Sequence, residues 1–160
     1  MFIALCLLIF LPVYAYSGQI GKMAPSFHFV GSNGNAVTLE QFKGKVVFLA
    51  FWAPWCIPCK EELPELEKLY QMYGKDGFEV IAISIESSDK NIAAFLKKVP
   101  LSVHFLIDKK NEVSDAYRVS SLPTGFIIGR DGMIKFQHRG FDKESPAVYE
   151  KEVVELLKQY

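Results

Sequence analysis

The stretch that decides the fold is VVFLAFWAPWCIPCKEELPEL, residues 46–66. It opens with an almost wholly apolar run, residues 46–52, as expected for a strand buried on both faces of a sheet. A segment with helical character follows at residues 56–73. Two cysteines, Cys56 and Cys59, lie where the strand gives way to the helix. The first question is what chemistry this pair supports.

The elements around this stretch alternate between strand and helix patterns. Apart from the strand at 46–52 and the helix at 56–73, we expect an N-terminal hairpin with arms at 27–30 and 36–39, strands at 78–85, 103–107, 126–128 and 133–138, and helices at 90–98, 111–117 and 146–160. Helices between strands imply crossovers and parallel pairs. The Asp131-Gly132 turn adds an antiparallel hairpin. The predicted fold class is α/β, with a mixed central sheet flanked by helices.

Length and charge limit the function classes. The 160 residues fit one compact domain, and half of them are hydrophobic. The formal net charge is zero, so nothing in the composition supports a nucleic-acid partner.

The first fifteen residues differ from the rest of the chain. Residues 1–15 are apolar and carry no charged side chain, and residues 2–11 have the length of a signal-peptide core. We expect cleavage after Ala15, or retention of the segment as a membrane anchor, and an exported domain over residues 16–160. Cleavage would also remove Cys6, which leaves both remaining cysteines in one C-x-x-C.

Two alternatives to redox chemistry are weaker for this pair. A closed zinc site needs four ligands, but His28, His104 and His138 are scattered and show no paired spacing. A purely structural disulfide across two residues would close a very small loop and constrain the unfolded chain little. We therefore favour a redox pair, with no metal and no cofactor beyond the Cys56–Cys59 disulfide.

The position of the pair suits thiol chemistry. A cysteine attacks as the thiolate, and free N–H groups at a helix N-terminus lower the pKa of a thiol placed there. Pro58 stands in the first helical turn, where its missing N–H costs nothing. We expect Cys56 to be the exposed nucleophile and Cys59 to be the buried thiol that resolves the mixed disulfide.

The helix after the pair has one carboxylate on its apolar face. At about 100° per residue, with Leu63 at zero, the apolar and aromatic positions fall between about 240° and 340°: Leu66, Leu69, Tyr70 and Tyr73. Cys59 and Glu62 fall within the same arc. A partly buried Glu has a raised pKa and can exchange protons near neutral pH. The alternative is that Glu62 extends along the surface to solvent.

Several short motifs carry a family resemblance. They are Ala24-Pro25-Ser26-Phe27, Gly44-Lys45-Val46-Val47, the W-C-x-x-C-x-x-E-x-P run from Trp55 to Pro64, Tyr117-Arg118-Val119 followed by Pro123-Thr124, and Asp131-Gly132. With these motifs the chain resembles the thioredoxin superfamily and, within it, the TlpA/ResA-like exported thiol–disulfide oxidoreductases. The resemblance covers about residues 20–158 and implies a thioredoxin-like fold.

The resemblance also implies roles for individual residues. Pro123 would be a cis-proline facing the cysteines, although X-Pro bonds in general favour trans. Trp55 would shield the disulfide, and Pro58, Pro123 and Thr124 would shape the substrate groove with it. Glu62 would be the active-site glutamate.

Further family features fall elsewhere in the chain. Residues 86–118 would hold the βα insertion of this family. Ala50 stands where thioredoxins carry a buried Asp, and Gly125 stands where relatives carry a bulkier residue, which predicts a wider floor beside Pro123.

The predicted function is an exported reductant of protein disulfides, in the periplasm or on the outer face of the cytoplasmic membrane. Relatives of this type reduce apocytochrome c and are recharged by a membrane thiol transporter of the CcdA or DsbD type. Three rivals stay open: an oxidant or isomerase on the same fold, a peroxidase, and a non-catalytic binding module. Ala53 weakens the peroxidase, because that chemistry needs Thr or Ser three residues before the nucleophile.

Overall fold

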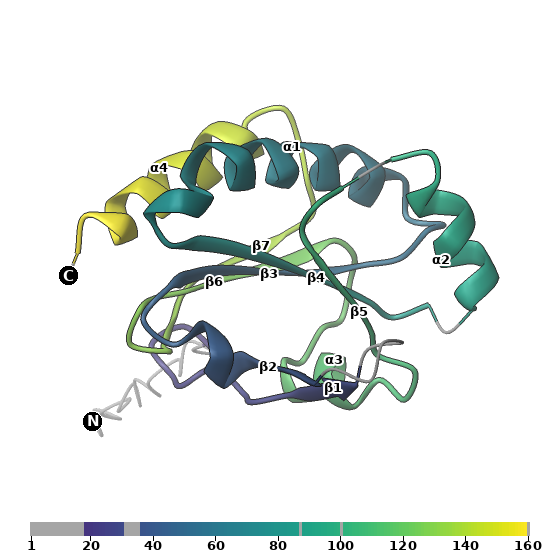
Figure 1. Ribbon diagram of the computed structural model, residues 1–160, viewed down its shortest axis with the longest axis horizontal. Coiled ribbons are helices and arrows are strands. Elements are labelled where there is room, and N and C mark those ends of the chain that lie inside the picture. Colours follow the sequence, from purple (N-terminus) through teal and green to yellow (C-terminus); the bar gives the residue numbers. More distant parts are fainter. Residues whose placement is uncertain (1–17, 31–35, 87, 100, 160) are drawn as a thin grey trace, which may run out of the picture.

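A five-stranded mixed sheet forms the centre of the molecule (Figure 1). The computed structural model describes residues 18–30, 36–86, 88–99 and 101–159. In sheet order, the strands are β5 (His104–Ile107), β4 (Phe78–Ser84), β3 (Val46–Trp52), β6 (Thr124–Ile128) and β7 (Ile134–Arg139). β3, β4 and β5 are parallel, while β6 and β7 run antiparallel to their neighbours. The predicted mixed α/β sheet is confirmed.

The central strand β3 separates two hydrophobic clusters. All seven of its residues are buried, and successive side chains point to opposite faces. Phe48 and Trp52 belong to the cluster on one face, and Leu49 and Phe51 to the cluster on the other. The continuous apolar run therefore fills two cores at once, which is why the strand shows no alternation.

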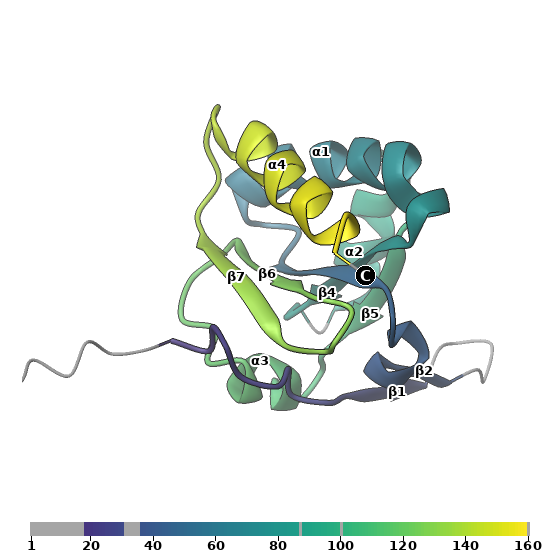
Figure 2. The same ribbon diagram turned by 90° about the vertical axis from the view of Figure 1, so that its left-hand side faces the viewer.

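Helices cover both faces of the sheet. α1 (Ile57–Tyr73), α4 (Ser145–Leu157) and α2 (Asp89–Leu96) lie on one side (Figure 1). The short helix α3 (Glu112–Ala116) and the hairpin of β1 (His28–Val30) and β2 (Ala36–Thr38) lie on the other (Figure 2). Two 3-10 turns, η1 (Leu39–Phe42) and η2 (Gly74–Asp76), precede β3 and β4.

Element boundaries differ from the sequence predictions by a few residues. α2 begins at Asp89, and its N-cap is Ser88, whose hydroxyl accepts the Asn91 N–H at 3.4 Å. The sequence prediction began this helix one residue later, at 90, and the Ser88 hydroxyl satisfies a free N–H at its start. The segment 86–118, predicted as an insertion, contains α2, β5 and α3.

The Asp-Gly turn between β6 and β7 forms as predicted. Gly132 has a φ of 78°, a left-handed conformation that glycine adopts without strain. The Asp131 carboxylate accepts the Met133 N–H at 3.0 Å. The turn thus fixes the antiparallel edge of the sheet.

The predicted leader, residues 1–15, lies outside the described residues. In the part of the chain that the structure describes, no helix is both long enough and apolar enough to cross a bilayer.

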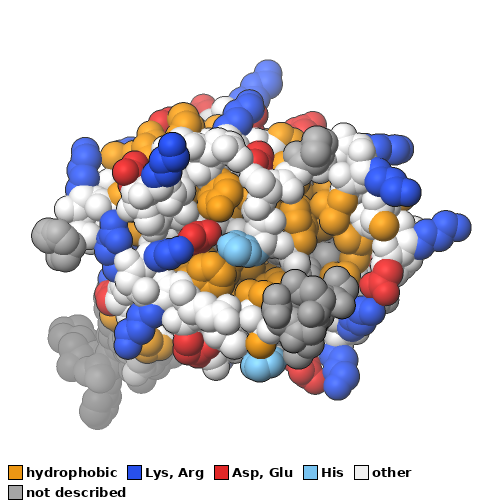
Figure 3. Space-filling view, viewed as in Figure 1, with side chains coloured by type: hydrophobic (Ala, Val, Ile, Leu, Met, Phe, Trp, Pro, Cys, Tyr) orange, Lys and Arg blue, Asp and Glu red, His pale blue; other side chains and the backbone are white. Residues whose placement is uncertain are grey.

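The surface is hollowed where α2 meets β5. Hydrophobic side chains gather over this part of the face (Figure 3). A pocket of about 740 Å³ is lined there by Ile92, Leu96 and Phe105, among others. It contains neither cysteine, so the redox pair lies elsewhere.

Candidate functional site

Cys56 is the N-cap residue of α1. β3 ends at Trp52, and the backbone turns through a hydrogen bond from the Cys56 N–H to the Ala53 carbonyl at 3.0 Å. The Cys56 sulfur then accepts the N–H of Cys59 at 3.3 Å. Pro58 occupies the first turn. The sulfur therefore lies at the positive end of the helix dipole, as the sequence predicted, and this environment favours a thiolate.

The two cysteines form a disulfide. Cys59 is fully buried, and Cys56 is 5% exposed. Cys56 is thus the more accessible of the two, but the prediction of an exposed side chain was wrong. As the helix cap, its sulfur turns back toward the first turn of α1 rather than outward.

An apolar pocket of about 510 Å³ opens beside Cys56. It is lined by Trp55, Cys56, Ile57, Pro58, Ile85, Val119, Ser120, Ser121 and Leu122. Trp55 and Ile57 are 63% and 71% exposed, so two large hydrophobic side chains stand at the surface next to a reactive sulfur. The pocket therefore places an apolar surface beside the disulfide.

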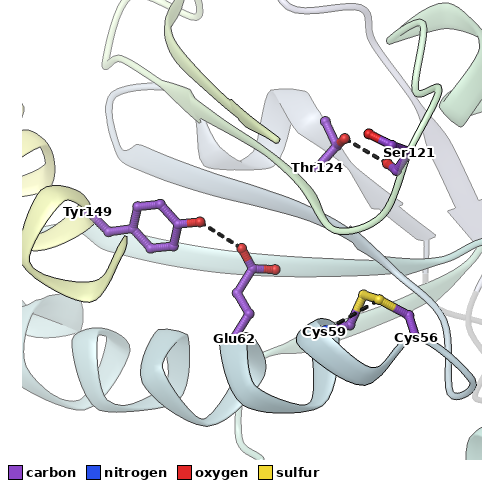
Figure 4. Close-up of a disulfide and its surroundings, with 6 residues drawn as sticks. All are labelled: Cys56, Cys59, Glu62, Ser121, Thr124 and Tyr149. Carbon is purple, nitrogen blue, oxygen red and sulfur yellow. Dashed lines mark hydrogen bonds between the residues drawn. A yellow bond between two sulfur atoms is a disulfide. The ribbon is translucent and has the colours of Figure 1, made fainter. Parts of the chain in front are cut away.

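The predicted groove residues Pro123 and Thr124 are not in the lining of this pocket but directly follow Leu122, which is. The Leu122-Pro123 peptide bond is cis, as the family resemblance implied. Thr124 is buried, and its hydroxyl donates to the Ser121 carbonyl at 2.8 Å (Figure 4). Leu122 and Ser121 line the pocket, while the side chain of Thr124 holds the turn from within.

Glu62 lies on the buried side of α1, one turn beyond Cys59 (Figure 4). Its side chain is 0% exposed. The Tyr149 hydroxyl donates to Oε1 at 2.9 Å. Oε2 has no hydrogen-bond partner within the described part of the chain, and it is turned to the side on which the disulfide lies (Figure 4). The helical-wheel placement is confirmed, and the surface alternative for Glu62 was wrong.

Burial changes the proton affinity of this carboxyl. It raises the pKa of Glu62 from 4.5 to about 7, and the hydrogen bond from Tyr149 partly opposes the rise. Removing a carboxylate from water disfavours its charged form, which is the larger effect here. A carboxyl with this pKa can take or give a proton near neutral pH.

The predicted widening beside Pro123 was wrong. Gly125 pairs with Ala50 across β6 and β3. A Cβ at position 125 would lie 2.7 Å from the ring of Phe48, so that ring already fills the space. The Phe48 ring also packs against Tyr149, with centroids 4.9 Å apart. Gly125 therefore makes room for an aromatic pair behind the site.

Tyr149 is the site residue that the sequence prediction missed. The sequence prediction gave a helix at 146–160 and assigned no role to Tyr149, which is buried, while its neighbour Val148 is exposed. The buried positions of α4 are Tyr149, Val153 and Leu156. Their spacing of four and three residues is the normal pattern of a packed helix face and could have identified Tyr149.

Fold and site together define a class of protein. A disulfide at the N-terminus of the first helix, a cis-proline before β6 and a buried glutamate one helical turn from the pair occur here on a thioredoxin-like fold. A solved structure from Chlorobium tepidum, designated a thiol:disulfide interchange protein of the DsbE type, matches with a TM-score of 0.83 and 33% identity over 88% of this chain and 99% of that one. A thiol-disulfide oxidoreductase from Bacteroides fragilis matches with a TM-score of 0.70 and 28% identity, over 82% and 99%.

Sequence comparison narrows the class further. The model of the AhpC/TSA family matches residues 20–137. The thiol-disulfide oxidoreductase ResA of Bacillus thuringiensis is 39% identical over 122 residues, which cover 76% of this chain and 70% of that protein. ResA of Bacillus subtilis is 37% identical over 114 residues, or 71% and 64% of the two chains. The chain belongs to the AhpC/TSA family and is a ResA-like thiol–disulfide oxidoreductase.

Proposed function

We propose that this oxidoreductase works as a reductant of disulfides in exported proteins. The observation that carries the proposal is the Cys56–Cys59 pair at the α1 N-terminus with the buried carboxyl of Glu62 one turn away. The pair supplies two electrons, and Glu62 exchanges the proton that the buried Cys59 must lose.

The proposed reaction has two thiol–disulfide exchanges. In the reduced protein, the Cys56 thiolate attacks a substrate disulfide, forms a mixed disulfide and expels one substrate thiolate. Cys59 then gives its proton to Glu62, and its thiolate attacks the Cys56 sulfur. The Cys56–Cys59 bond forms as the second substrate thiolate leaves. The substrate gains two electrons, and its thiolates take up protons from solvent as their pKa values require.

The apolar pocket is proposed to hold the substrate backbone beside Cys56. Trp55 and Pro58 would form its floor and edge, consistent with their place in the lining. Pro123 would shape the turn that carries Leu122 into the pocket. The hydroxyl of Thr124 is already bonded to Ser121, so Thr124 would act through the turn rather than by touching substrate.

The proposed setting follows the resemblance to TlpA/ResA-like proteins. Apocytochrome c cysteines, kept reduced before haem attachment, are the proposed substrate. A membrane thiol transporter of the CcdA or DsbD type is the proposed electron donor. Residues 1–15 would direct export or anchor the domain on the outer face of the cytoplasmic membrane.

A trapping experiment tests the proposal. In Cys59→Ser the resolving thiol is absent, so mixed disulfides through Cys56 should accumulate in an exporting cell. Their identification by mass spectrometry should give cytochrome c precursors on one side and a membrane thiol transporter on the other. Cys56→Ser is the matched control and should trap nothing. Absence of any Cys56 adduct in Cys59→Ser would overturn the oxidoreductase mechanism for this chain.

The direction of electron flow has its own measurement. Potentials on this fold run from about −270 mV for thioredoxin to about −120 mV for DsbA. A reductant should lie toward the first value and be found as the dithiol in cells. A potential above about −150 mV, with the protein disulfide-bonded in cells, would make it an oxidant or isomerase instead.

A further inference from the structure

The two oxygens of Glu62 face different parts of the molecule. Oε2 is turned toward the disulfide, and Oε1 accepts the Tyr149 hydroxyl from α4 (Figure 4). The hydrogen bond joins residues 87 positions apart in the chain. Glu62 is fully buried, so a proton taken from Cys59 needs a path to solvent.

Tyr149 lies between Glu62 and the surface. It borders a pocket of about 440 Å³ that also contains Ser145 and Asp142. The Ser145 hydroxyl donates to the Asp142 carboxylate at 2.8 Å, and Asp142 is exposed. Tyr149 and Ser145 lie four residues apart on α4 and both line this pocket, so the Tyr149 side chain borders a space next to exposed Asp142.

Rings from other parts of the chain pack around the Tyr149 ring. Phe48 from β3 packs on one side, with ring centroids 4.9 Å apart. His138 from β7 packs at 4.8 Å, but its Nε2 lies 2.7 Å from Glu152 and is engaged there. Phe141 packs against the ring as well, with centroids 6.3 Å apart. The charged groups that line the pocket with Tyr149 are Arg139, Asp142 and Glu144.

We propose that the Tyr149 hydroxyl positions Glu62 toward Cys59 and passes the proton of Cys59 from Glu62 to the pocket beside Asp142, and so to solvent. The inference rests on the proposed function, because it concerns the step in which Cys59 resolves a mixed disulfide. Tyr149 is a positioning residue here, since it acts through Glu62.

The proton steps balance without another reactant. Cys59 gives its proton to Glu62, and the Cys59 thiolate forms the bond to Cys56. The protonated Glu62 carboxyl then turns and donates to the Tyr149 oxygen, as the Tyr149 hydroxyl turns and donates to solvent at the pocket that it borders. Glu62 ends as the carboxylate, Tyr149 keeps one hydroxyl proton, and one proton has left the protein.

The test uses Tyr149→Phe, with Tyr73→Phe as its matched control. Tyr73 on α1 donates to Glu150 on α4 at 2.6 Å, so both variants lose one hydroxyl from a Tyr–Glu bond between the same two helices. The reduced full chain is mixed with dithiobis(nitrobenzoate). Release of the first thionitrobenzoate reports attack by Cys56, and release of the second reports resolution by Cys59.

Tyr149→Phe should shift the pH midpoint of the second release upward by about one unit, since a hydrogen bond to the charged carboxylate is lost. Tyr73→Phe should leave the midpoint unchanged. In a Glu62→Gln background, Tyr149→Phe should produce no further shift. An unshifted midpoint in Tyr149→Phe, or an equal shift without Glu62, would overturn the proposal.

The path beyond Glu62 is tested separately by following proton release with an indicator dye in weak buffer at alkaline pH. In Tyr149→Phe, proton release should lag behind the second thionitrobenzoate, and in Tyr73→Phe the two should coincide. Simultaneous release in Tyr149→Phe would overturn the proton path. If neither thionitrobenzoate is released from the unmodified chain, the oxidoreductase mechanism itself has failed, which is a different result from an unshifted midpoint.

Discussion

Two buried glutamates lie on opposite faces of the same sheet and have opposite surroundings. Glu62 is 0% exposed and has a neutral partner, the Tyr149 hydroxyl. Glu79 on β4 is 7% exposed, but Lys45 Nζ lies 2.5 Å from its Oε1 and His104 Nε2 lies 3.3 Å from its Oε2. Within the described residues no cation lies against the Glu62 carboxyl, whereas Lys45 lies against that of Glu79.

This difference in surroundings distinguishes a carboxyl suited to proton exchange from one suited to a structural contact. A nearby cation offsets the cost of burying a carboxylate, so the charge can persist and serve as a structural contact. Without a cation, burial favours the protonated form, and the pKa of Glu62 rises to about 7. Burial alone therefore does not identify a proton-exchanging group; the proposed role of Glu62 is supported by its raised pKa and its place one helical turn from Cys59.

The largest expected effect comes from removing the Glu62 carboxylate. Glu62→Gln keeps the shape and an acceptor for Tyr149, but it cannot take the proton of Cys59. We expect resolution of the mixed disulfide at neutral pH to slow by about 10²- to 10⁴-fold, the usual contribution of a general base. The second phase of thionitrobenzoate release measures it.

The pH dependence is the sharper readout for this variant. In the unmodified chain the resolution rate should rise with pH through about 7, as Glu62 becomes the carboxylate. In Glu62→Gln the rise should occur only where Cys59 itself ionises. Superimposable profiles from pH about 5 to 10, a range spanning the ordinary Glu and Cys values, would return Glu62 to a purely structural role.

The next-largest expected effect is the pH dependence that Glu62 gives to the free energy of unfolding. The pKa of Glu62 is about 7 in the folded chain and 4.5 without burial. Between these values the folded state holds a proton that the unfolded state has lost, so stability falls as pH rises. The full loss, reached above pH 7, is about 3 kcal/mol, from about 1.4 kcal/mol per pKa unit.

Urea unfolding of the oxidised protein at several pH values measures this loss. Between pH 4.5 and 7, the unmodified chain should lose stability relative to Glu62→Gln, whose side chain does not titrate. A constant difference between the two proteins across this window would show that the carboxyl titrates normally despite its burial.

Local sequence patterns predicted much of the site. The apolar run of β3 and the C-x-x-C after it place Cys56 at the helix cap, because a buried strand must end where a polar helix begins. The helical wheel placed Glu62 on the buried face, since angular position along a helix depends only on its period. Both inferences needed no information from distant parts of the chain.

The rest depended on contacts between distant segments. Tyr149 reaches Glu62 from the last helix, and Phe48 fills the space that Gly125 leaves on a neighbouring strand. The low exposure of Cys56 follows from its cap geometry, which a residue pattern does not specify. The partners of Glu79 could not be predicted from local patterns either, because Lys45 precedes β3 and His104 begins β5, both distant from Glu79 in the chain.

The smallest expected effect completes the comparison. Glu79→Gln removes the charge that pairs with Lys45, whose side chain is 43% exposed. A half-exposed cation can return to solvent, so we expect a loss of about 1 kcal/mol or less in unfolding free energy. The pH midpoint of mixed-disulfide resolution should not move, because Glu79 lies on the face of the sheet opposite α1. A midpoint shift in Glu79→Gln equal to that of Tyr149→Phe would mean that any buried carboxylate acts on the cysteines at long range, and the contrast between the two glutamates would fail.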